Sequence, residues 1–144
     1  MKERSYGICP YYIKDRKIFI LLNKTSYISD WNFFKGKIEK EETKKECVIR
    51  EFIEEARFDL SDYKLENYFE QKNRRKDIGI FLVQIEDKID FYFDRKEIFE
   101  YQWLELNPNI KLSKNQQKIF NDIFIFFKPL RDYLEFTSIT KNYK

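Results

Sequence analysis

No histidine occurs in the sequence of 144 residues. Without it, a catalytic serine or cysteine cannot be activated by an imidazole base, and zinc sites that need a histidine ligand are excluded. Carboxylates are then the main side chains left for acid–base work and for holding a metal ion. If the chain is an enzyme, we expect its chemistry to depend on Asp and Glu.

Cysteine and long apolar runs are also scarce. Cys9 and Cys47 are the only cysteines, and their spacing is not that of a disulfide framework, which favours reduced thiols. No apolar run approaches the ~18 residues of a membrane span, and the N-terminal MKERSYG lacks the apolar core of a signal peptide. These absences predict a cytoplasmic protein with no membrane association.

What the chain does contain is apolar and aromatic residues in proportions typical of a folded protein. Hydrophobic residues make up 42% of the sequence and aromatic residues 19%, so we expect a single domain over residues 1–144. The 28 basic and 25 acidic residues leave a net charge of +3. This mild charge permits an anionic ligand but does not by itself indicate a nucleic-acid-binding protein.

Hydrophobic periodicity predicts several strands and two helices. The expected strands cover residues 6–13, 17–23, 31–34, 65–71, 76–85, 89–93 and 97–104. One helix is expected from Thr43 to about Ala56. A C-terminal helix is expected over about 113–135, capped by Ser113 and kinked or restarted at Pro129. One early and one late helix among strands indicate an α/β (α+β) fold in which a mixed sheet is covered on both faces.

The early helix carries a dense acidic face. Glu51, Glu54 and Glu55 stand at i, i+3 and i+4, so they share an arc of roughly 100° on the helix surface. At that spacing the carboxylates repel one another by a few tenths of a kcal/mol per pair. A divalent cation held by hard oxygen ligands would offset this repulsion. The alternative is an ordinary acidic face in contact with water.

The residues before this helix add two further signals. Thr43 and Glu46 have the spacing of a capping box, which places the start of the helix at Thr43. Gly36, one of only three glycines, leads the irregular segment that precedes it. A glycine there indicates a backbone that turns tightly or approaches a ligand.

Together these residues resemble the signature of the Nudix hydrolase family, G-x5-E-x7-R-E-U-x-E-E-x-G-U, where U is a bulky apolar residue. The matching positions are Gly36, Glu42, Arg50, Glu51, Phe52, Glu54, Glu55 and Phe58. Arg57 departs from the signature, because the family has a glycine there that ends the helix in the left-handed conformation. The resemblance implies a Nudix-type α/β/α sandwich. It also implies a metal-dependent hydrolase that cleaves a phosphoanhydride bond in a nucleoside diphosphate linked to another moiety.

The resemblance also implies roles for these residues. Glu51, Glu54, Glu55 and the backbone carbonyl of Gly36 would bind Mg²⁺ or Mn²⁺, and Arg50 would orient the acidic side chains. Glu42 would have a supporting role.

The general base is left open by the resemblance. In Nudix enzymes it is either a Glu of the signature or one outside it, near the last strand. Glu97 is the candidate for the outside position and Glu100 is the second choice, which gives Glu51, Glu54, Arg50 and Glu97 as candidate catalytic residues.

Candidate substrate-binding residues follow from charge and aromaticity. Lys35 and Lys37 flank Gly36 and could contact phosphates, as could the basic turn formed by Arg74, Arg75 and Lys76. The aromatic candidates for stacking on a nucleobase are Tyr12, Tyr27 and Trp31. Each could instead be an ordinary surface or core residue.

The segment 34–38 resembles the P-K-G-K/H-I/V lead-in of two Nudix subgroups, with Phe34 in place of the usual proline. One subgroup contains dinucleoside-polyphosphate hydrolases, and the other contains mRNA-decapping and RNA 5′-pyrophosphohydrolase enzymes. We therefore expect a dinucleoside polyphosphate or related nucleotide as substrate, followed by an RNA 5′ end. A third reading is a degenerate module that binds nucleotides without cleaving them. The oligomeric state is left open.

Overall fold

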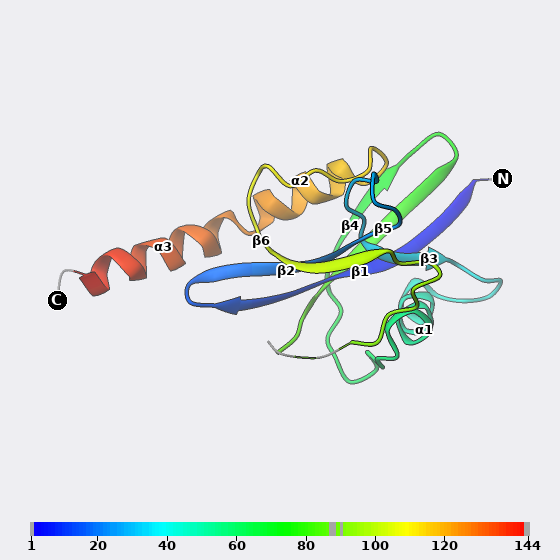
Figure 1. Cartoon of the computed structure of the whole chain (residues 1–144), viewed down its shortest axis with the longest axis horizontal. Helices are drawn as coiled ribbons and strands as arrows, with labels where there is room; N and C mark the ends of the chain where they lie inside the picture. Colours follow the sequence, from blue (N-terminus) through cyan, green and yellow to red (C-terminus); the bar gives the residue numbers. More distant parts are fainter. Residues whose placement is uncertain (1, 87–88, 90, 143–144) are drawn as a thin grey trace.

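The computed structural model describes residues 2–86, 89 and 91–142, which form a six-stranded mixed sheet and three helices (Figure 1). The strands are β1 (Glu3–Lys14), β2 (Lys17–Lys24), β3 (Phe34–Lys37), β4 (Glu66–Lys72), β5 (Lys76–Gln84) and β6 (Glu100–Glu105). The helices are α1 (Lys44–Ala56), α2 (Gln117–Phe126) and α3 (Lys128–Asn142).

The strand order is β4-β5-β1-β2-β6, and β3 pairs with β1 off this path. β1 and β5 run parallel, whereas the other pairs are antiparallel. The first half of β1 pairs with β3 over residues 5–8, and its second half pairs with β2 over residues 11–14. As a result, β3 is a short edge strand next to the place where β2 ends.

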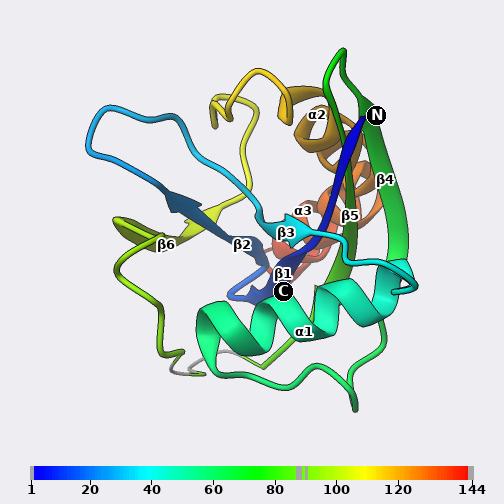
Figure 2. The same cartoon turned by 90° about the vertical axis from the view of Figure 1, so that its right-hand side faces the viewer.

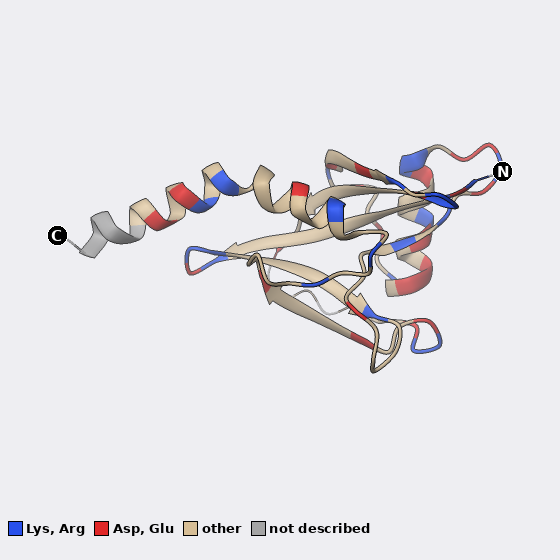
Figure 3. Cartoon of the chain, turned by 90° about the horizontal axis from the view of Figure 1, so that it is seen from above, with Lys and Arg blue, Asp and Glu red and all other residues tan. Residues whose placement is uncertain are grey.

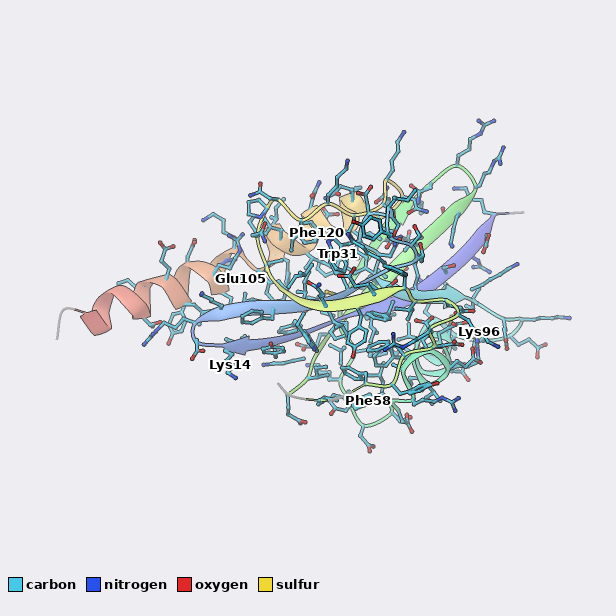
Figure 4. All side chains as sticks on the ribbon, in the orientation of Figure 1. Lys14, Trp31, Phe58, Lys96, Glu105 and Phe120 are labelled. Atoms are coloured by element: carbon cyan, nitrogen blue, oxygen red, sulfur yellow. The ribbon has the colours of Figure 1, made fainter. Side chains whose placement is uncertain are left out.

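The sheet separates two apolar clusters. Tyr6 and Ile8 on β1 belong to the cluster under α1, whereas Cys9 and Tyr11 belong to the cluster under α2. This alternation follows from the period of two along a strand. α1 therefore covers one face and α2 covers the other, as Figure 1 shows, and the expected mixed-sheet sandwich is confirmed. In Figure 4 the labelled Phe58 lies on the α1 side, and Phe120 lies on the α2 side.

The third strand begins later than predicted. Trp31 and Asn32 form single bridges with Leu112 and Asn23, and β3 starts at Phe34. Gly36 therefore lies inside a strand rather than at the start of a loop. Its φ is not positive, because no described glycine has a positive φ.

Two other strand predictions need correction. The described part of the segment 89–93 is irregular and not a strand, and Asp90 lies outside the described residues. The alternation there reflects packing, because Phe91 and Phe93 contact Phe52 and Phe34 over the α1 cluster. The last strand begins at Glu100 rather than Glu97, which lies in the preceding turn.

The C-terminal helix is two helices, α2 and α3, and the second extends to Asn142 rather than 135. Ser113 does not cap α2. Its hydroxyl donates to Asn32 Oδ1 at 2.9 Å, and the N-cap position belongs to Gln116. α3 restarts beside Pro129, where the missing N–H of a first-turn residue breaks no helical bond. No helix of the described chain is long and apolar enough to cross a membrane.

Candidate active site

α1 begins at a capping box that fixes which face the helix presents. The Glu46 N–H donates to Thr43 Oγ1 at 3.1 Å, and the Thr43 N–H donates to Glu46 Oε1 at 2.9 Å. The predicted start of the helix is therefore confirmed. The cap sets the rotation of the acidic residues that follow, and Figure 3 shows acidic residues recurring along α1 and the loop before it.

Arg50 ties this helix to the preceding loop. Its Nε donates to Glu42 Oε2 at 2.6 Å and its Nη2 donates to Glu42 Oε1 at 3.0 Å, which is a bidentate pair. Nη2 also donates to the Lys37 carbonyl at 3.0 Å, while Nη1 donates to Glu51 Oε1 at 2.9 Å. One guanidinium thus holds both the loop and the Glu51 carboxylate in place.

Glu51 lies directly against the backbone of Gly36. A Cβ atom added to Gly36 would come within 1.9 Å of the Glu51 carboxyl carbon. The glycine is therefore needed for close approach, not for a left-handed turn. The Gly36 carbonyl accepts a weak hydrogen bond from Cys47 Sγ at 3.5 Å, so helix and strand meet there through small groups.

Glu54 and Glu55 have opposite environments. The Glu54 side chain is 58% exposed and lies 3.5 Å from Arg50 Nη1. Glu55 is buried, with 7% of its surface exposed. Burial, followed by repulsion from Glu51 and a hydrogen bond to it, raises the pKa of Glu55 to about 9.

This acidic face fits a divalent cation in its donor chemistry. Glu51, Glu54, Glu55 and the Gly36 carbonyl supply hard oxygen atoms of the kind that such a cation prefers. Within the described part of the chain, however, no three acidic or cysteine side chains are already arranged to hold an ion. If an ion binds here, Glu51, Glu54, Glu55 and the Gly36 carbonyl would hold it.

A cavity of about 140 Å³ adjoins Glu55. Its lining residues are Asn23, Thr25, Asn32, Phe33, Lys35, Glu55, Glu97 and Ile98. The structure thus brings together Lys35 and two predicted acidic residues, Glu55 and Glu97. Burial is the main cause that lowers the pKa of Lys35 to about 8, and repulsion from Lys76 adds to it. A desolvated lysine beside a phosphate-sized space can bind an anion.

Gly36, Arg50 and the acidic helix are thus arranged in space as the sequence signature implies. The NUDIX domain family model matches residues 1–123. The chain belongs to this family.

Related Nudix proteins include decapping enzymes. The mRNA-decapping enzyme subunit 2 of Saccharomyces cerevisiae is 37% identical over 103 residues, which are 69% of this chain and 10% of that protein. The mRNA decapping complex subunit 2 of Schizosaccharomyces pombe is 32% identical over 122 residues, which are 79% of this chain and 16% of that protein. The chain therefore spans about a tenth to a sixth of the length of these relatives.

Solved Nudix structures share the fold. The crystal structure of a C. elegans Ap4A hydrolase binary complex aligns with a TM-score of 0.70 at 21% identity, covering 87% of this chain and 97% of that chain. The E. coli dihydroneopterin triphosphate pyrophosphohydrolase aligns with a TM-score of 0.65 at 17% identity, covering 85% and 94%. At these identities the likeness concerns the fold alone.

Two predicted substrate-binding residues, Arg74 and Arg75, do not lie near α1, the helix that carries the signature glutamates. Arg74 lines a different cavity with Ser113, Lys114 and two asparagines, and the Arg75 carbonyl accepts from the Glu3 N–H at 3.0 Å. The β4–β5 turn that carries both arginines lies at the end of the molecule away from α1 (Figure 2). The strand pairing, not the basic sequence of the turn, decides this position.

Three other predicted residues have different surroundings. The Lys37 side chain is exposed, and its carbonyl is held by Arg50. Tyr27 is 82% exposed and packs edge-on against Phe99, with 6.4 Å between the ring centroids. Glu100 lines an aromatic cavity, not the one beside Glu55, and its Oε1 accepts from Gln102 at 2.7 Å.

The remaining stacking candidates are occupied by packing. Tyr12 contacts Trp103 with 4.7 Å between the ring centroids, and Lys24 lies over the Trp31 ring at 4.7 Å.

A buried amide network supports the lining of the Glu55 cavity, and no sequence pattern indicated it. Gln116 Nε2 donates to Asn32 Oδ1 at 2.7 Å, and the Phe33 N–H donates to Gln116 Oε1 at 2.8 Å. Asn23 Nδ2 donates to the Asn32 carbonyl at 3.2 Å. The two contacts of Gln116 join residues more than 80 positions apart, so no local pattern reveals them.

Arg57 adopts the left-handed conformation that the signature glycine would have. Its φ is 54°, and its N–H donates to the Ile53 carbonyl at 2.9 Å. The guanidinium lies 5.6 Å from the centre of the Tyr92 ring, which is a cation–π contact. That contact offsets part of the cost of a side chain in this conformation.

The Glu42–Arg50 pair predicts a specific acid sensitivity. The hydrogen bonds from Arg50 are the main cause that lowers the pKa of Glu42 from 4.5 to about 2. The pair therefore stabilises the fold fully above pH 4.5, and this contribution is lost as the pH falls toward 2. We expect Glu42→Gln to be less stable than wild type at pH 7 and to lose less stability between pH 4.5 and 2.

Urea unfolding at a series of pH values would measure this difference. Glu39→Gln is the matched control, because Glu39 lies 3.6 Å from Arg50 Nη1 but is 67% exposed. Parallel pH profiles for wild type and Glu42→Gln would show that the pair contributes nothing to acid sensitivity.

Proposed function

We propose that the chain is a metal-dependent hydrolase that cleaves a phosphoanhydride bond in a nucleoside diphosphate linked to another moiety. The observation that carries this proposal is the placement of the Nudix carboxylates. Glu51 lies against Gly36, and Glu55 lines a cavity with Lys35 and Glu97. One proposed acidic ligand, a lysine and a second carboxylate thus line one phosphate-sized space.

The ion would be Mg²⁺ or Mn²⁺, held by Glu51, Glu54 and Glu55 with the Gly36 carbonyl. When bound, such an ion supplies positive charge for the phosphates and lowers the pKa of a bound water. Mg²⁺ in proteins typically keeps several bound waters and is held by a few carboxylates together with the phosphates of the substrate.

The chain's own residues supply the remaining functions. Arg50 keeps Glu51 oriented through its 2.9 Å bond, and its bidentate bond to Glu42 keeps the guanidinium itself from moving. Lys35 lines the cavity beside Glu55 and binds a phosphate oxygen there. Glu97 is exposed at the cavity and accepts the proton of the attacking water.

The substrate class that fits best has two nucleosides joined by a polyphosphate. This class includes both a capped RNA 5′ end and a dinucleoside polyphosphate. The 32–37% identity to decapping enzymes over 103–122 residues favours capped RNA. Dinucleoside polyphosphates are the second candidate, supported by the resemblance of segment 34–38 to their hydrolases. A degenerate binding module is disfavoured because Arg50 and every signature glutamate are present and Arg50 is fully engaged.

The test offers the purified protein a substrate panel with Mg²⁺ or Mn²⁺ and separates the products by chromatography. The panel contains capped and 5′-triphosphate RNA, dinucleoside polyphosphates, nucleotide sugars and nucleoside triphosphates. Cleavage of capped RNA, with binding that weakens steeply as salt rises, would support the decapping activity. Cleavage of dinucleoside polyphosphates alone would select the second candidate. No cleavage across the panel would contradict the proposed activity.

A further inference from the structure

A second cavity, of about 380 Å³, adjoins the one beside Glu55, and this inference rests on the proposed function. Its lining residues are Phe91, Tyr92, Phe93, Arg95, Ile98, Phe99, Glu100 and Tyr101. We propose that this aromatic cavity binds the base of the nucleotide whose phosphate is cleaved. Its volume lies within the range of small-molecule sites, about 300–1,000 Å³.

The two cavities are neighbours and share one lining residue. Ile98 lines both, and its neighbours Glu97 and Phe99 each line one. A nucleotide with its base against Phe99 would therefore place its phosphates toward Lys35 and Glu55. No other described cavity shares a lining residue with the one beside Glu55.

The aromatic rings are exposed in a way that favours stacking. Phe99 is 53% exposed, and Tyr92 and Tyr101 are exposed as well. The Tyr101 ring packs on the buried Phe93 ring, with 4.0 Å between the ring centroids, and this contact holds Tyr101 in position. Arg95 and Glu100 add a hydrogen-bond donor and an acceptor beside the rings. A nucleobase presents a flat face and a mixed donor and acceptor edge, which fits this lining.

Phe34 and Arg57 both depart from the sequence patterns described above, and both contact residues that line the aromatic cavity. Phe34, in place of the usual proline, packs against Phe93 with 5.1 Å between the ring centroids. Arg57, in place of the usual glycine, lies over Tyr92 at 5.6 Å. The Phe34 and Arg57 side chains thus support two consecutive residues of the segment that lines the aromatic cavity.

The direct test measures nucleotide binding rather than turnover. Isothermal titration compares adenosine and guanosine 5′-monophosphate with ribose 5-phosphate, which lacks a base. Because stacking on an aromatic ring contributes roughly 1–3 kcal/mol per base, Phe99→Ala should weaken nucleotide binding by about five- to a hundredfold. The affinity for ribose 5-phosphate should not change in Phe99→Ala. The variant Phe99→Trp, which keeps an aromatic ring, should bind nucleotides about as tightly as wild type.

Tyr133→Ala is the matched control, because Tyr133 is an equally exposed aromatic residue on α3. Melting temperatures of all variants exclude unfolding as the cause. Equal nucleotide affinity in folded Phe99→Ala and wild type would overturn the proposal, and so would the absence of nucleotide binding by wild type.

The role of Arg57 as a positioning residue has its own readout. Arg57→Gly should raise KM by about two- to fivefold with kcat unchanged, because a cation–π contact at an exposed site is worth roughly 0.5–1 kcal/mol. A fall in kcat at constant KM would contradict this role.

The outcomes separate the aromatic cavity from the proposed activity. If nucleotides bind through Phe99 but nothing on the panel is cleaved, the base site stands and the proposed activity fails. If the panel is cleaved but Phe99→Ala leaves KM unchanged, the activity stands and the base site fails.

Discussion

Glu54→Gln is expected to abolish hydrolysis while leaving the melting temperature close to that of wild type. Glu54 has the most exposed carboxylate of the three on the Nudix helix, and its closest partner is Arg50 Nη1 at 3.5 Å. Such an exposed pair contributes at most about 1 kcal/mol to stability. The same carboxylate is a proposed metal ligand, and the ion supplies several kcal/mol of transition-state stabilisation. The rate should therefore fall on the order of a hundredfold or more.

The control for this variant is Glu39→Gln. Glu39 also faces Arg50, at 3.6 Å, but it lies in the loop before α1. Steady-state rates over a range of Mg²⁺ concentrations would distinguish the two variants. If Glu54→Gln kept a near-normal rate at low Mg²⁺, Glu54 would not be a ligand. An equal loss in Glu39→Gln would mean that net charge near Arg50, rather than a ligand position, governs the rate.

The parts of the structure that were predicted well are those set by local rules. α1 is capped by Thr43 because its cap depends on residues three positions apart, and it ends at Ala56 as predicted. The sandwich followed from the order of strands and helices, because one face of each element must be buried. The bidentate contact of Arg50 with Glu42 agrees with the supporting role that the family signature implies for Glu42.

The parts that could not be predicted depend on contacts between distant residues. The start of α2 is set by Gln116, whose amide reaches Asn32 and Phe33 across the fold. The basic turn of Arg74 and Arg75 lies away from the helix because β5 pairs in parallel with β1, and charge alone does not encode that pairing. Part of the aromatic cavity is lined by residues 91–93. The alternation of apolar and polar residues there is typical of a strand, so the sequence did not indicate that this segment lines a cavity.

Gly36→Ala is expected to remove most of the activity at a smaller cost in stability. The added methyl group would overlap the Glu51 carboxylate, with 1.9 Å between Cβ and Cδ. Because this carboxylate is the far end of a flexible side chain, it can swing away, but it then loses its 2.9 Å bond to Arg50. A charge-assisted hydrogen bond of this kind is worth about 1.5–3 kcal/mol, which sets the expected loss of stability. The rate should fall about a hundredfold, because a proposed metal ligand is displaced.

A double-mutant cycle with Glu51→Ala tests whether the glycine serves this one carboxylate. If Gly36 is needed only to make room for Glu51, removing the Glu51 side chain makes the added methyl harmless. The double variant should then be about as stable as Glu51→Ala alone, with a coupling of roughly 0.5–3 kcal/mol between the two sites. Additive losses would instead mean that the β3 backbone itself requires glycine. In that case position 36 would matter for the pairing of β3 with β1, and the close contact with Glu51 would be a consequence of that pairing rather than its reason.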